Sequence, residues 1–331
     1  MRRKTNLRLS SIFAAAVIGL GALGAFAPAA HAEDGAEVEE FTNTTPAVWL
    51  QISPVSNKVT LIAGENNDYS FTVSNIGSET FGFHVYAAPY SISDEDYNVN
   101  FSNETNRTQI SRWIKFYDDE GKLVDKASFK IESGAKKVVN YRIEVPKDVP
   151  DGGQYATIFA ESDETEGDLT GSGIKTVSRV GLIVYGRTEG NTEEVANITD
   201  FKIPTFMTSG KISATSKVEN GGNTDFEAVY NFEISSIFGK QLFAKTNAYN
   251  ILPDTTRRVD MEWDETPMMG FYKVHYRVSA LNGETAREDT KIVVIMPVWM
   301  IIISIILLTF IVLWVIILIR KRSERKSRRL V

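Results

Sequence analysis

The sequence contains no cysteine and only three histidines in 331 residues. The absence of cysteine excludes disulfides, thiolate metal sites and cysteine nucleophiles. One histidine, His31, belongs to the export signal described below, so His84 and His275 remain in the exported part. These two fall in different predicted domains, which argues against a shared zinc site. Each exported domain must therefore be stabilised by the packing of its own core.

Basic residues are also scarce between the two ends of the chain. Once the four near the amino terminus and the seven at the carboxyl end are set aside, 25 Lys and Arg remain against 41 Asp and Glu, a net charge of −16. Such a surface repels phosphate, so we expect no nucleic-acid partner. The sequence has no Gly-rich phosphate loop, nucleophile elbow or H-E-x-x-H motif. We therefore expect no catalytic residue, no cofactor and no metal site.

An export signal occupies the amino-terminal end. Four basic residues within the first eight precede an apolar run, Ile12–Phe26, and Ala30-His31-Ala32 follows it. A basic start, a short apolar centre and an A-x-A cleavage site are typical of a secretory signal peptide. We predict a signal peptide over residues 1–32 and a flexible acidic leader over residues 33–46.

The longest uncharged run, residues 292–319, lies near the carboxyl end. Because a bilayer core of about 30 Å needs roughly 20 helical residues, this run predicts a transmembrane helix, which we place over residues 295–319. Trp299 and Trp314 are suitable interfacial anchors. Residues 320–331 hold seven Lys or Arg and one Glu, so the positive-inside rule places this basic tail in the cytoplasm, against lipid headgroups. The protein is predicted to be a single-pass cell-membrane protein with an extracellular amino terminus.

Short alternating runs predict β-strands between these two ends. Val59–Ile62, Tyr69–Val73 and Phe81–Tyr86 alternate with a period of two, and Asn75–Ser78 is a turn cluster between the last two. No stretch away from the termini sustains a helical period. We predict an all-β fold of two immunoglobulin-like β-sandwich domains followed by one C-terminal transmembrane helix.

The exported part of the sequence repeats itself. The pattern V-x-N-x-G-x-x-x-F begins at Val73 and again at Val218, and the pattern P-x-x-G-x-Y begins at Pro150 and again at Pro267. The first pattern predicts a strand, a turn whose residues tolerate φ > 0, and a return strand anchored by an aromatic ring. The same order in both copies indicates two domains of one kind.

This repeat places one domain over residues 47–188 and the other over residues 197–294, with a polar linker over residues 189–196. The two patterns are 77 residues apart in the first copy and 49 in the second, so the first domain carries an insertion near residues 88–117. Binding residues concentrate on loops that extend from a rigid sandwich. We therefore expect the insertion to face outward and to carry the binding surface.

Aromatic residues are the main candidates for ligand contacts. Sandwich cores need such rings, so we expect Trp49, Trp113 and Trp263 to be buried. Tyr90 and Tyr97 lie in the insertion and are expected to be exposed, where a tyrosine ring can stack on a sugar or anchor a protein partner.

An acidic segment, residues 161–168, lies between two predicted strands. Its spacing departs from the D-x-[DN]-x-[DN]-G pattern of a calcium-binding loop. A solvated hairpin tip and a calcium loop both remain open for this segment.

Five segments of the first domain carry a resemblance to a known family. They are Ile52–Ser56, Leu61–Glu65, Phe71–Asn75, Ser111–Ile114 and Val145–Ala156. The fourth contains a tryptophan, and the last contains the strand entry P-D-G-G-Q-Y. These segments resemble the extracellular WxL-interacting proteins, once known only as a domain of unknown function.

The resemblance covers Val48–Tyr185, and it extends to Asn197–Val294 in architecture alone. It implies that the first domain binds cell-wall peptidoglycan and that the second binds a host-surface or partner protein. The sequence contains no W-x-L motif, so the chain is not itself the WxL partner. Trp113 and Tyr155 lie in the resembling segments and, with Tyr90 and Tyr97, are our candidate ligand-binding residues.

We expect a bacterial, membrane-anchored and non-catalytic binding protein that presents its sandwiches to cell-wall polymer or to a surface or host protein. Addition of a strand at an open sheet edge would provide one mode of protein binding. Two alternatives belong to other classes. One is a surface hydrolase that acts on glycans through acidic residues of the insertion, and the other is a structural subunit of a membrane-associated assembly.

Overall fold

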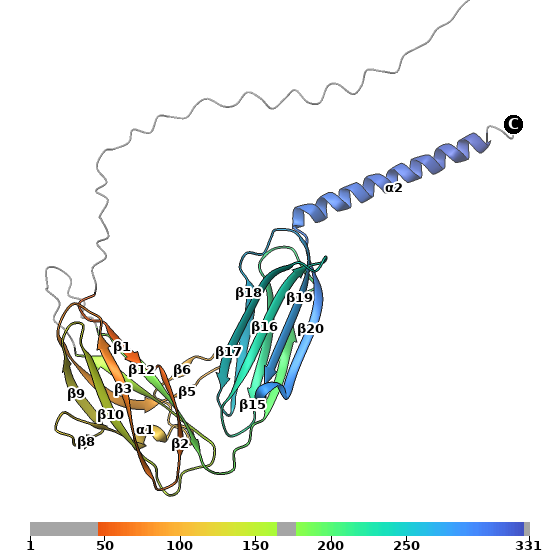
Figure 1. Ribbon diagram of the computed structural model, residues 1–331. Coiled ribbons are helices and arrows are strands. Elements are labelled where there is room, and N and C mark those ends of the chain that lie inside the picture. The colour runs from red at the N-terminus through yellow and green to blue at the C-terminus, as the bar shows by residue number, and fades with distance from the viewer. Residues whose placement is uncertain (1–45, 164–176, 328–331) are drawn as a thin grey trace, which may run out of the picture. The chain divides into compact units, whose positions relative to one another are not determined.

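The first sandwich consists of two five-stranded sheets that pack face to face (Figure 1). The computed structural model describes residues 46–163 and 177–327 of the chain. One sheet of the first sandwich has the order β1-β3-β10-β7-β8, formed by Leu50–Ser53, Asn66–Asn75, Lys136–Glu144, Ile114–Tyr117 and Leu123–Val124. The other has the order β2-β12-β11-β4-β9, formed by Ser56–Leu61, Arg179–Thr188, Gly153–Ser162, Phe81–Pro89 and Lys126–Ile131.

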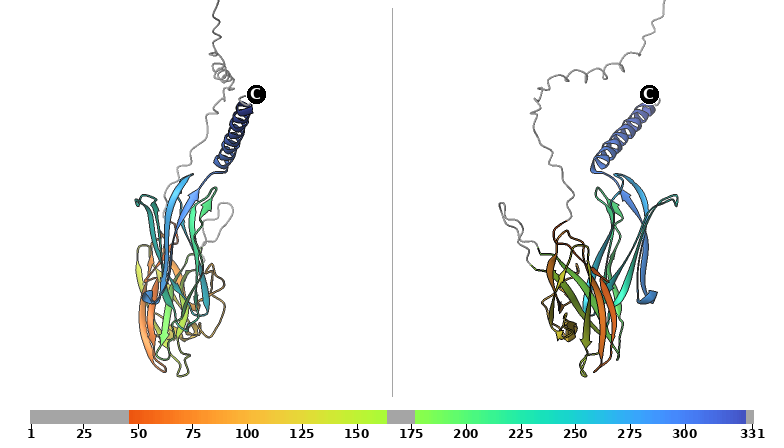
Figure 2. Two further views of the ribbon diagram at one scale, coloured as in Figure 1. Left: turned by 90° about the vertical axis from the view of Figure 1, so that its right-hand side faces the viewer. Right: turned by 60° about the vertical axis from the view of Figure 1, so that its left-hand side comes forward.

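The second sandwich has a three-stranded and a five-stranded sheet, which Figure 2 shows as two layers in green to blue. The smaller sheet has the order β13-β15-β18, formed by Ala196–Lys202, Ile212–Asn220 and Thr255–Trp263. The larger has the order β14-β20-β19-β16-β17, formed by Phe206–Met207, Thr285–Ile295, Gly270–Ala280, Phe226–Ser236 and Gln241–Ile251. A short 3-10 turn, Leu281–Gly283, joins β19 to β20. The predicted all-β fold with one terminal helix is confirmed.

Alternation along the strands builds a separate core in each sandwich. In β16, for example, every second side chain is buried over most of its length. Phe83, Phe116 and Tyr141 are fully buried in the first core, and Tyr230 and Tyr276 are fully buried in the second. Burying one such ring stabilises the fold by about 2–3 kcal/mol, so these two clusters account for stability without disulfides.

Apart from β7 and β8, which belong to the insertion, the two sandwiches share one strand order, in agreement with the repeated sequence patterns. In the first sandwich β1 pairs with β3, and a turn at Asn75 leads from β3 to β4. In the second sandwich β13 pairs with β15, and a turn at Asn220 leads from β15 to β16. The side-chain oxygen of Asn75 accepts a hydrogen bond from the amide of Gly77 at 2.9 Å, and Asn220 accepts one from Gly222 at the same distance. Both asparagines are buried, at 1% exposure.

Glycine is required in these turns for a reason other than the one expected from the sequence. Gly77 and Gly222 do not have positive φ angles. A Cβ atom at Gly77 would lie 2.5 Å from the carbonyl oxygen of Ala47, and one at Gly222 would lie 2.2 Å from that of Glu193. The incoming chain passes so close to each turn that no side chain fits.

The insertion lies between β4 and β9 and spans residues 90–125, whereas residues 237–240 join the corresponding strands β16 and β17. It therefore ends later than the expected residues 88–117, because its last part, β7 and β8, extends the sheet beside β10. It also contains a small hairpin, β5 (Ser91–Ile92) and β6 (Val99–Asn100), and one helical turn, α1 (Ile110–Trp113).

The apolar run near the carboxyl end is divided between a strand and a helix. Residues 292–295 complete β20, where Val293 and Ile295 are buried in the second core. Pro297 lacks an amide for the sheet and precedes α2 (Val298–Ser327). The expected helix start at residue 295 is thus three residues too early. The 23 residues Val298–Arg320 include an 18-residue stretch of mean hydropathy 3.3 and form a helix long and apolar enough to cross a membrane.

Candidate functional site

The hairpin of the insertion contacts the second sandwich. The hydroxyl oxygen of Tyr97 accepts a hydrogen bond of 2.6 Å from the amide of Leu252 and lies 3.3 Å from Oγ1 of Thr255. In addition, the amide of Arg258 donates to the carbonyl oxygen of Glu95 at 2.7 Å. Tyr97 has a φ of 67°, a left-handed conformation that costs a non-glycine residue about 1 kcal/mol or more. The surrounding contacts must hold it there.

Opposite charges meet across the same contact. The carboxylate of Glu95 lies 2.7 Å from Nζ of Lys217, and the carboxylate of Asp96 lies 3.3 Å from the guanidinium of Arg258. The hydrogen bond that Lys217 donates to Glu95 is the main cause that raises the pKa of Lys217, and Asp200 adds to it. The insertion thus supplies the acidic side of this contact, and β15 and β18 supply the basic side.

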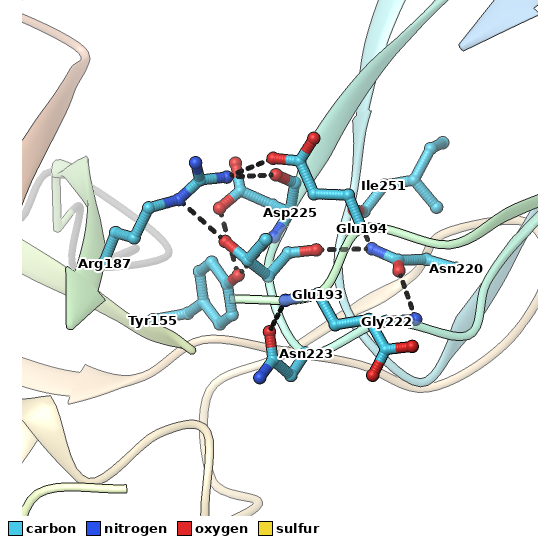
Figure 3. A network of polar contacts seen from close by, with 10 residues as sticks. Tyr155, Arg187, Glu193, Glu194, Asn220, Gly222, Asn223, Asp225 and Ile251 are labelled. Carbon is cyan, nitrogen blue, oxygen red and sulfur yellow. Dashed lines mark hydrogen bonds and ion pairs between the residues drawn. The ribbon is translucent and has the colours of Figure 1, made fainter. Parts of the chain in front are cut away.

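A second set of polar contacts joins β11 and β12 to the asparagine turn of the second sandwich (Figure 3). The hydroxyl of Tyr155 donates to Oδ1 of Asp225 at 3.0 Å and accepts from the amide of Asp225 at 2.9 Å. Arg187 donates to Oγ1 of Thr224 at 2.9 Å, to Glu194 at 2.7 Å and to the carbonyl oxygen of Asp225 at 3.2 Å. Burial is the main cause that raises the pKa of Tyr155 well above its ordinary value.

The linker is held by this network as well. The amide of Glu193 donates to Oδ1 of Asn223 at 2.8 Å, and Nδ2 of Asn223 donates to the carbonyl oxygen of Asn191 at 2.7 Å. The amide of Gly153, at the start of β11, donates to the carbonyl oxygen of Asn223 at 2.8 Å. Asn223 therefore ties the linker and the first sandwich to one turn of the second.

Aromatic rings fill the space between these two sets of polar contacts. Tyr90, Tyr155 and Leu252 form a small buried cluster, against which Tyr97 and Tyr185 pack. The guanidinium of Arg257 lies 4.2 Å from the ring centre of Tyr97, a cation–π contact. We call this cluster and the polar contacts around it the junction.

A cavity of about 170 Å³ opens beside the junction, bounded by the insertion on one side and the turn at residues 252–255 on the other. This L-P-D-T stretch joins β17 to β18. Its role in contacting the first sandwich was not foreseen.

Three of the four candidate residues lie together in the junction, and the fourth does not. Tyr90 is 8% exposed and Tyr155 is 1% exposed, while Tyr97 is half-buried. The expected exposure of Tyr90 and Tyr97 is therefore wrong, because the second sandwich covers the hairpin that carries them. Trp113 lies in α1 and packs in the core of the first sandwich. A ligand-binding role for the four residues stays a prediction.

The prediction that the insertion faces outward is wrong for its hairpin, because the hairpin contacts the second sandwich. Burial is confirmed for Trp113 and Trp263, whereas Trp49 is 49% exposed. Sequence reasoning also missed Lys217, Asp225 and Arg257. The sequence held one indication of this contact: the insertion is acidic at residues 94–96, and the second domain has two adjacent basic residues, Arg257 and Arg258.

The same sequence pattern serves different contacts in its two copies. The Tyr272 hydroxyl donates to the carbonyl oxygen of Met269 at 3.0 Å, a tyrosine corner within the second sandwich. Tyr155, at the equivalent position, uses its hydroxyl for Asp225. A tyrosine that would stabilise one sandwich alone thus becomes part of the junction.

An open groove of about 530 Å³ lies on the first sandwich, away from the junction. It is lined by Asp68, Tyr69, Ser70, Tyr117, Asp118, Asp119, Gly121 and Asn140. Arg142 donates to both carboxylate oxygens of Asp68 at 2.8 Å, and the Tyr117 hydroxyl donates to Oδ1 at 3.0 Å. The Arg142 hydrogen bonds are the main cause that lowers the pKa of Asp68. The groove combines tyrosine rings with carboxylate and amide oxygens, which can accept hydrogen bonds from hydroxyl groups.

The two histidines make structural contacts. Nε2 of His84 lies 3.5 Å from Glu161 and Nδ1 lies 3.4 Å from Asp163, while Nδ1 of His275 lies 2.9 Å from Oγ1 of Thr290. Within the described residues, no group of three or more His, Asp or Glu side chains could hold a metal ion. Most of the acidic segment 161–168 lies outside the described residues, so the calcium question stays open.

No protein-family model and no curated protein matches the chain. Several solved structures show a weak likeness. The class 5 fimbriae chaperone CfaA is 13% identical, with a TM-score of 0.37, over 73% of this chain and 98% of its own. The CsuC–CsuE chaperone–tip subunit complex of Acinetobacter baumannii is 14% identical, with a TM-score of 0.35, over 73% of this chain and 98% of its own. The Salmonella enterica SafA pilin–SafB chaperone complex is 12% identical, with a TM-score of 0.34, over 76% of this chain and 99% of its own. Likeness of this size carries no argument about what the chain does.

Proposed function

We propose that the protein is a non-catalytic binding protein of the bacterial cell surface, anchored in the membrane by α2. The junction is the observation that supports this most. Its buried tyrosines and ion pairs hold the two sandwiches to each other, and β20 continues into the apolar helix after two residues. Such a chain places a fixed pair of sandwiches next to a membrane, which is the arrangement that a surface receptor or adaptor needs.

The proposed orientation places both sandwiches outside the cell and the basic tail in the cytoplasm. It is supported by the seven Lys and Arg of residues 320–331 and by the signal-like sequence over residues 1–32. The resemblance to WxL-interacting proteins is part of the same proposal, since those proteins share this order of signal peptide, two sandwiches, helix and basic tail.

The groove on the first sandwich is the surface that we propose for a cell-wall polymer. Glycan strands offer many hydroxyl donors and apolar ring faces, and the groove offers Asp118, Asp119 and Asn140 as acceptors beside Tyr69 and Tyr117. Asp68 is held ionised by Arg142, so it is suited to accept a hydrogen bond and unsuited to donate a proton to a leaving group. This favours binding over glycan hydrolysis.

Retention on insoluble cell wall tests the proposal. The detergent-solubilised full chain is mixed with purified wall, and both the protein retained and the soluble sugar released are measured. We expect retention without sugar release, and we expect Asn140→Ala and Tyr117→Ala to weaken retention. Asn197→Ala is the matched control, because Asn197 is equally exposed but lies on the second sandwich. Release of sugar, or equal retention of all variants, would contradict the proposal.

A second candidate function, binding of a protein partner by strand addition, is favoured by β17. This strand has 11 residues and pairs with β16 alone, so one of its edges carries unpaired main-chain groups. An edge of this length is a template for an extended peptide. Lysine at Ala244 and Ala248, two small exposed residues of this strand, should abolish such binding, while lysine at the exposed Glu233 of β16, which is paired on both sides, should not. Cross-linking of surface proteins to the three forms would decide this.

A further inference from the structure

Large apolar side chains are exposed at one end of the second sandwich. Phe238 is 92% exposed and Met268 is 77% exposed. Four more residues at this end, each about half exposed, complete a set that we call the apolar tip: Phe206, Ile237, Met269 and Phe271. A side chain such as Phe238 loses about 2–3 kcal/mol of transfer free energy by remaining in water, so the set points to a partner surface.

Strand register places the whole apolar tip at the end where the chain leaves for α2. Phe206 and Phe271 both pair with Val294, the residue before the last of β20. The hairpin with Ile237 and Phe238 follows Ser236, which pairs with Tyr272 on the next strand. Met268 and Met269 directly precede Gly270, which pairs with Ile295. Figure 1 shows that α2 follows β20 at this end of the sandwich.

Chain length limits how far the apolar tip can lie from the membrane. Only Met296 and Pro297 separate Ile295 from the first residue of α2, and three extended steps span about 10 Å at most. The apolar helix Val298–Arg320 covers about 34 Å, slightly more than a hydrocarbon core of about 30 Å. The headgroup layer adds several ångström on each side, so the tip must come within reach of it.

We propose that the apolar tip lies in the lipid interface of the membrane that α2 crosses, so that the second sandwich is seated on the bilayer. This rests on the proposed anchoring by α2. Phenylalanine and methionine are suited to the boundary between headgroups and acyl chains, and Trp299, 51% exposed in the first turn of α2, is a typical interfacial residue.

The charged residues at this end of the sandwich are compatible with a position in the lipid interface. Lys240 follows Phe238 in the hairpin, and Lys273 lies on the outer face of β19 two residues after Phe271, where both can reach lipid phosphate. Asp264 lies in the same loop as Met268 and is paired with Lys211. Glu265, in the same loop, has no ion pair among the described residues, and its side chain is exposed.

Single-cysteine labelling tests the seat directly, because the chain has no cysteine of its own. Phe238→Cys, Met268→Cys, Val138→Cys and Leu308→Cys are each made in the full chain, labelled with a polarity-sensitive fluorophore and reconstituted in phosphatidylcholine–phosphatidylglycerol vesicles. Val138 is 57% exposed on the first sandwich and is the matched aqueous control, while Leu308 lies in α2 and reports anchoring. Quenching is measured with iodide in water and with nitroxide attached to lipid.

We expect iodide to quench the labels at 238 and 268 about threefold less than the label at 138, and we expect lipid nitroxide to quench them strongly, because interfacial side chains lie about 5–10 Å deep. Labels at 238 and 268 that behave like that at 138 would overturn the proposal. Protection from iodide without quenching by lipid would also overturn it, in favour of a protein partner or a second copy of the chain. Leu308→Cys separates the two proposals: without lipid quenching at 308, the anchoring itself fails.

Discussion

At the scale of single residues, the two asparagine turns show how one side chain organises a sandwich. Asn220 donates from Nδ2 to the carbonyl oxygens of Thr224 and Ile251, and its Oδ1 accepts from the amide of Gly222. Asn75 makes the corresponding bonds to Glu79 and Gly77. Each asparagine thereby satisfies main-chain groups that lie too deep for water, and its removal leaves them unpaired.

We therefore expect Asn220→Ala to destabilise the second sandwich by about 3 kcal/mol, since three buried main-chain groups would lose their partner. Urea denaturation followed by tyrosine and tryptophan fluorescence measures the change. Asn66→Ala is the matched control, because Asn66 is exposed at the start of β3. A loss no larger than that of the control would mean that water or a shifted backbone satisfies these groups.

Tyr141 makes the first sandwich sensitive to alkali. Burial raises the pKa of Tyr141 to about 12 from its ordinary value near 10. A group whose pKa is raised in the folded state contributes its stability in full below about pH 10 and loses it as the pH rises toward 12. The shift corresponds to about 3 kcal/mol.

We expect Tyr141→Phe to flatten the fall in the free energy of unfolding between pH 10 and 12 by about this amount. The variant also loses the hydrogen bond from Asn57 at 3.0 Å, so its stability at neutral pH drops by about 1 kcal/mol. Urea denaturation at a series of pH values separates the two effects. An unchanged slope would show that Tyr141 does not control the alkaline transition.

At the scale of elements, local patterns were predictable from the sequence and long-range partners were not. The period of two in β3 and β4 and the turn at Asn75 depend on neighbouring residues, so the sandwich could be inferred from them. The contact of Glu95 with Lys217 joins residues far apart in the chain, and no local rule selects that pair. The helix was expected to start at residue 295, within β20, because a buried strand and a membrane helix require the same apolar residues.

Tyr155 and Tyr272 occupy equivalent positions in the two sandwiches, and replacing each in turn tests whether the junction depends on Tyr155. Tyr155→Phe removes the hydrogen bond to Asp225 and leaves the amide of Asp225 without its partner, so we expect faster hydrogen exchange there and at Glu193 in the linker. Tyr272→Phe removes only the bond to Met269 and should leave exchange in the linker unchanged. Equal effects of the two variants on the linker would contradict the assigned role of Tyr155.

The ion pair of the insertion offers a test by charge exchange. Glu95→Lys and Lys217→Glu each place like charges together, and we expect either to loosen the junction and to speed hydrogen exchange at the amide of Arg258. The double variant restores opposite charges at positions 95 and 217, and we expect slower exchange than in either single variant, with a smaller difference at high salt. Recovery is only partial because Asp200 lies 3.2 Å from Lys217 and would face a glutamate there. A double variant that exchanges as fast as the single variants would contradict this role of the pair.

At the scale of the whole molecule, charge is divided sharply along the chain. The part between the two ends carries a net charge of −16, and the twelve residues 320–331 carry seven basic groups and one acidic group. The helix between them is uncharged over residues 298–319, so the chain changes from acidic to basic across one membrane-spanning length. Sequence alone could supply this asymmetry, because it depends on composition and not on folding.

The positive-inside rule turns this asymmetry into a prediction of orientation. With an epitope tag after Val331, protease added to intact cells should remove both sandwiches and leave the tag protected. Changing Arg320, Lys321 and Arg322 to glutamate should expose the tag on a measurable fraction of molecules, whereas the same three changes at Lys126, Lys130 and Lys136 in the first sandwich should not. A tag that is cleaved on intact cells of the unaltered chain would reverse the orientation. It would also place the groove and the apolar tip on the cytoplasmic side, where no cell-wall polymer could reach them.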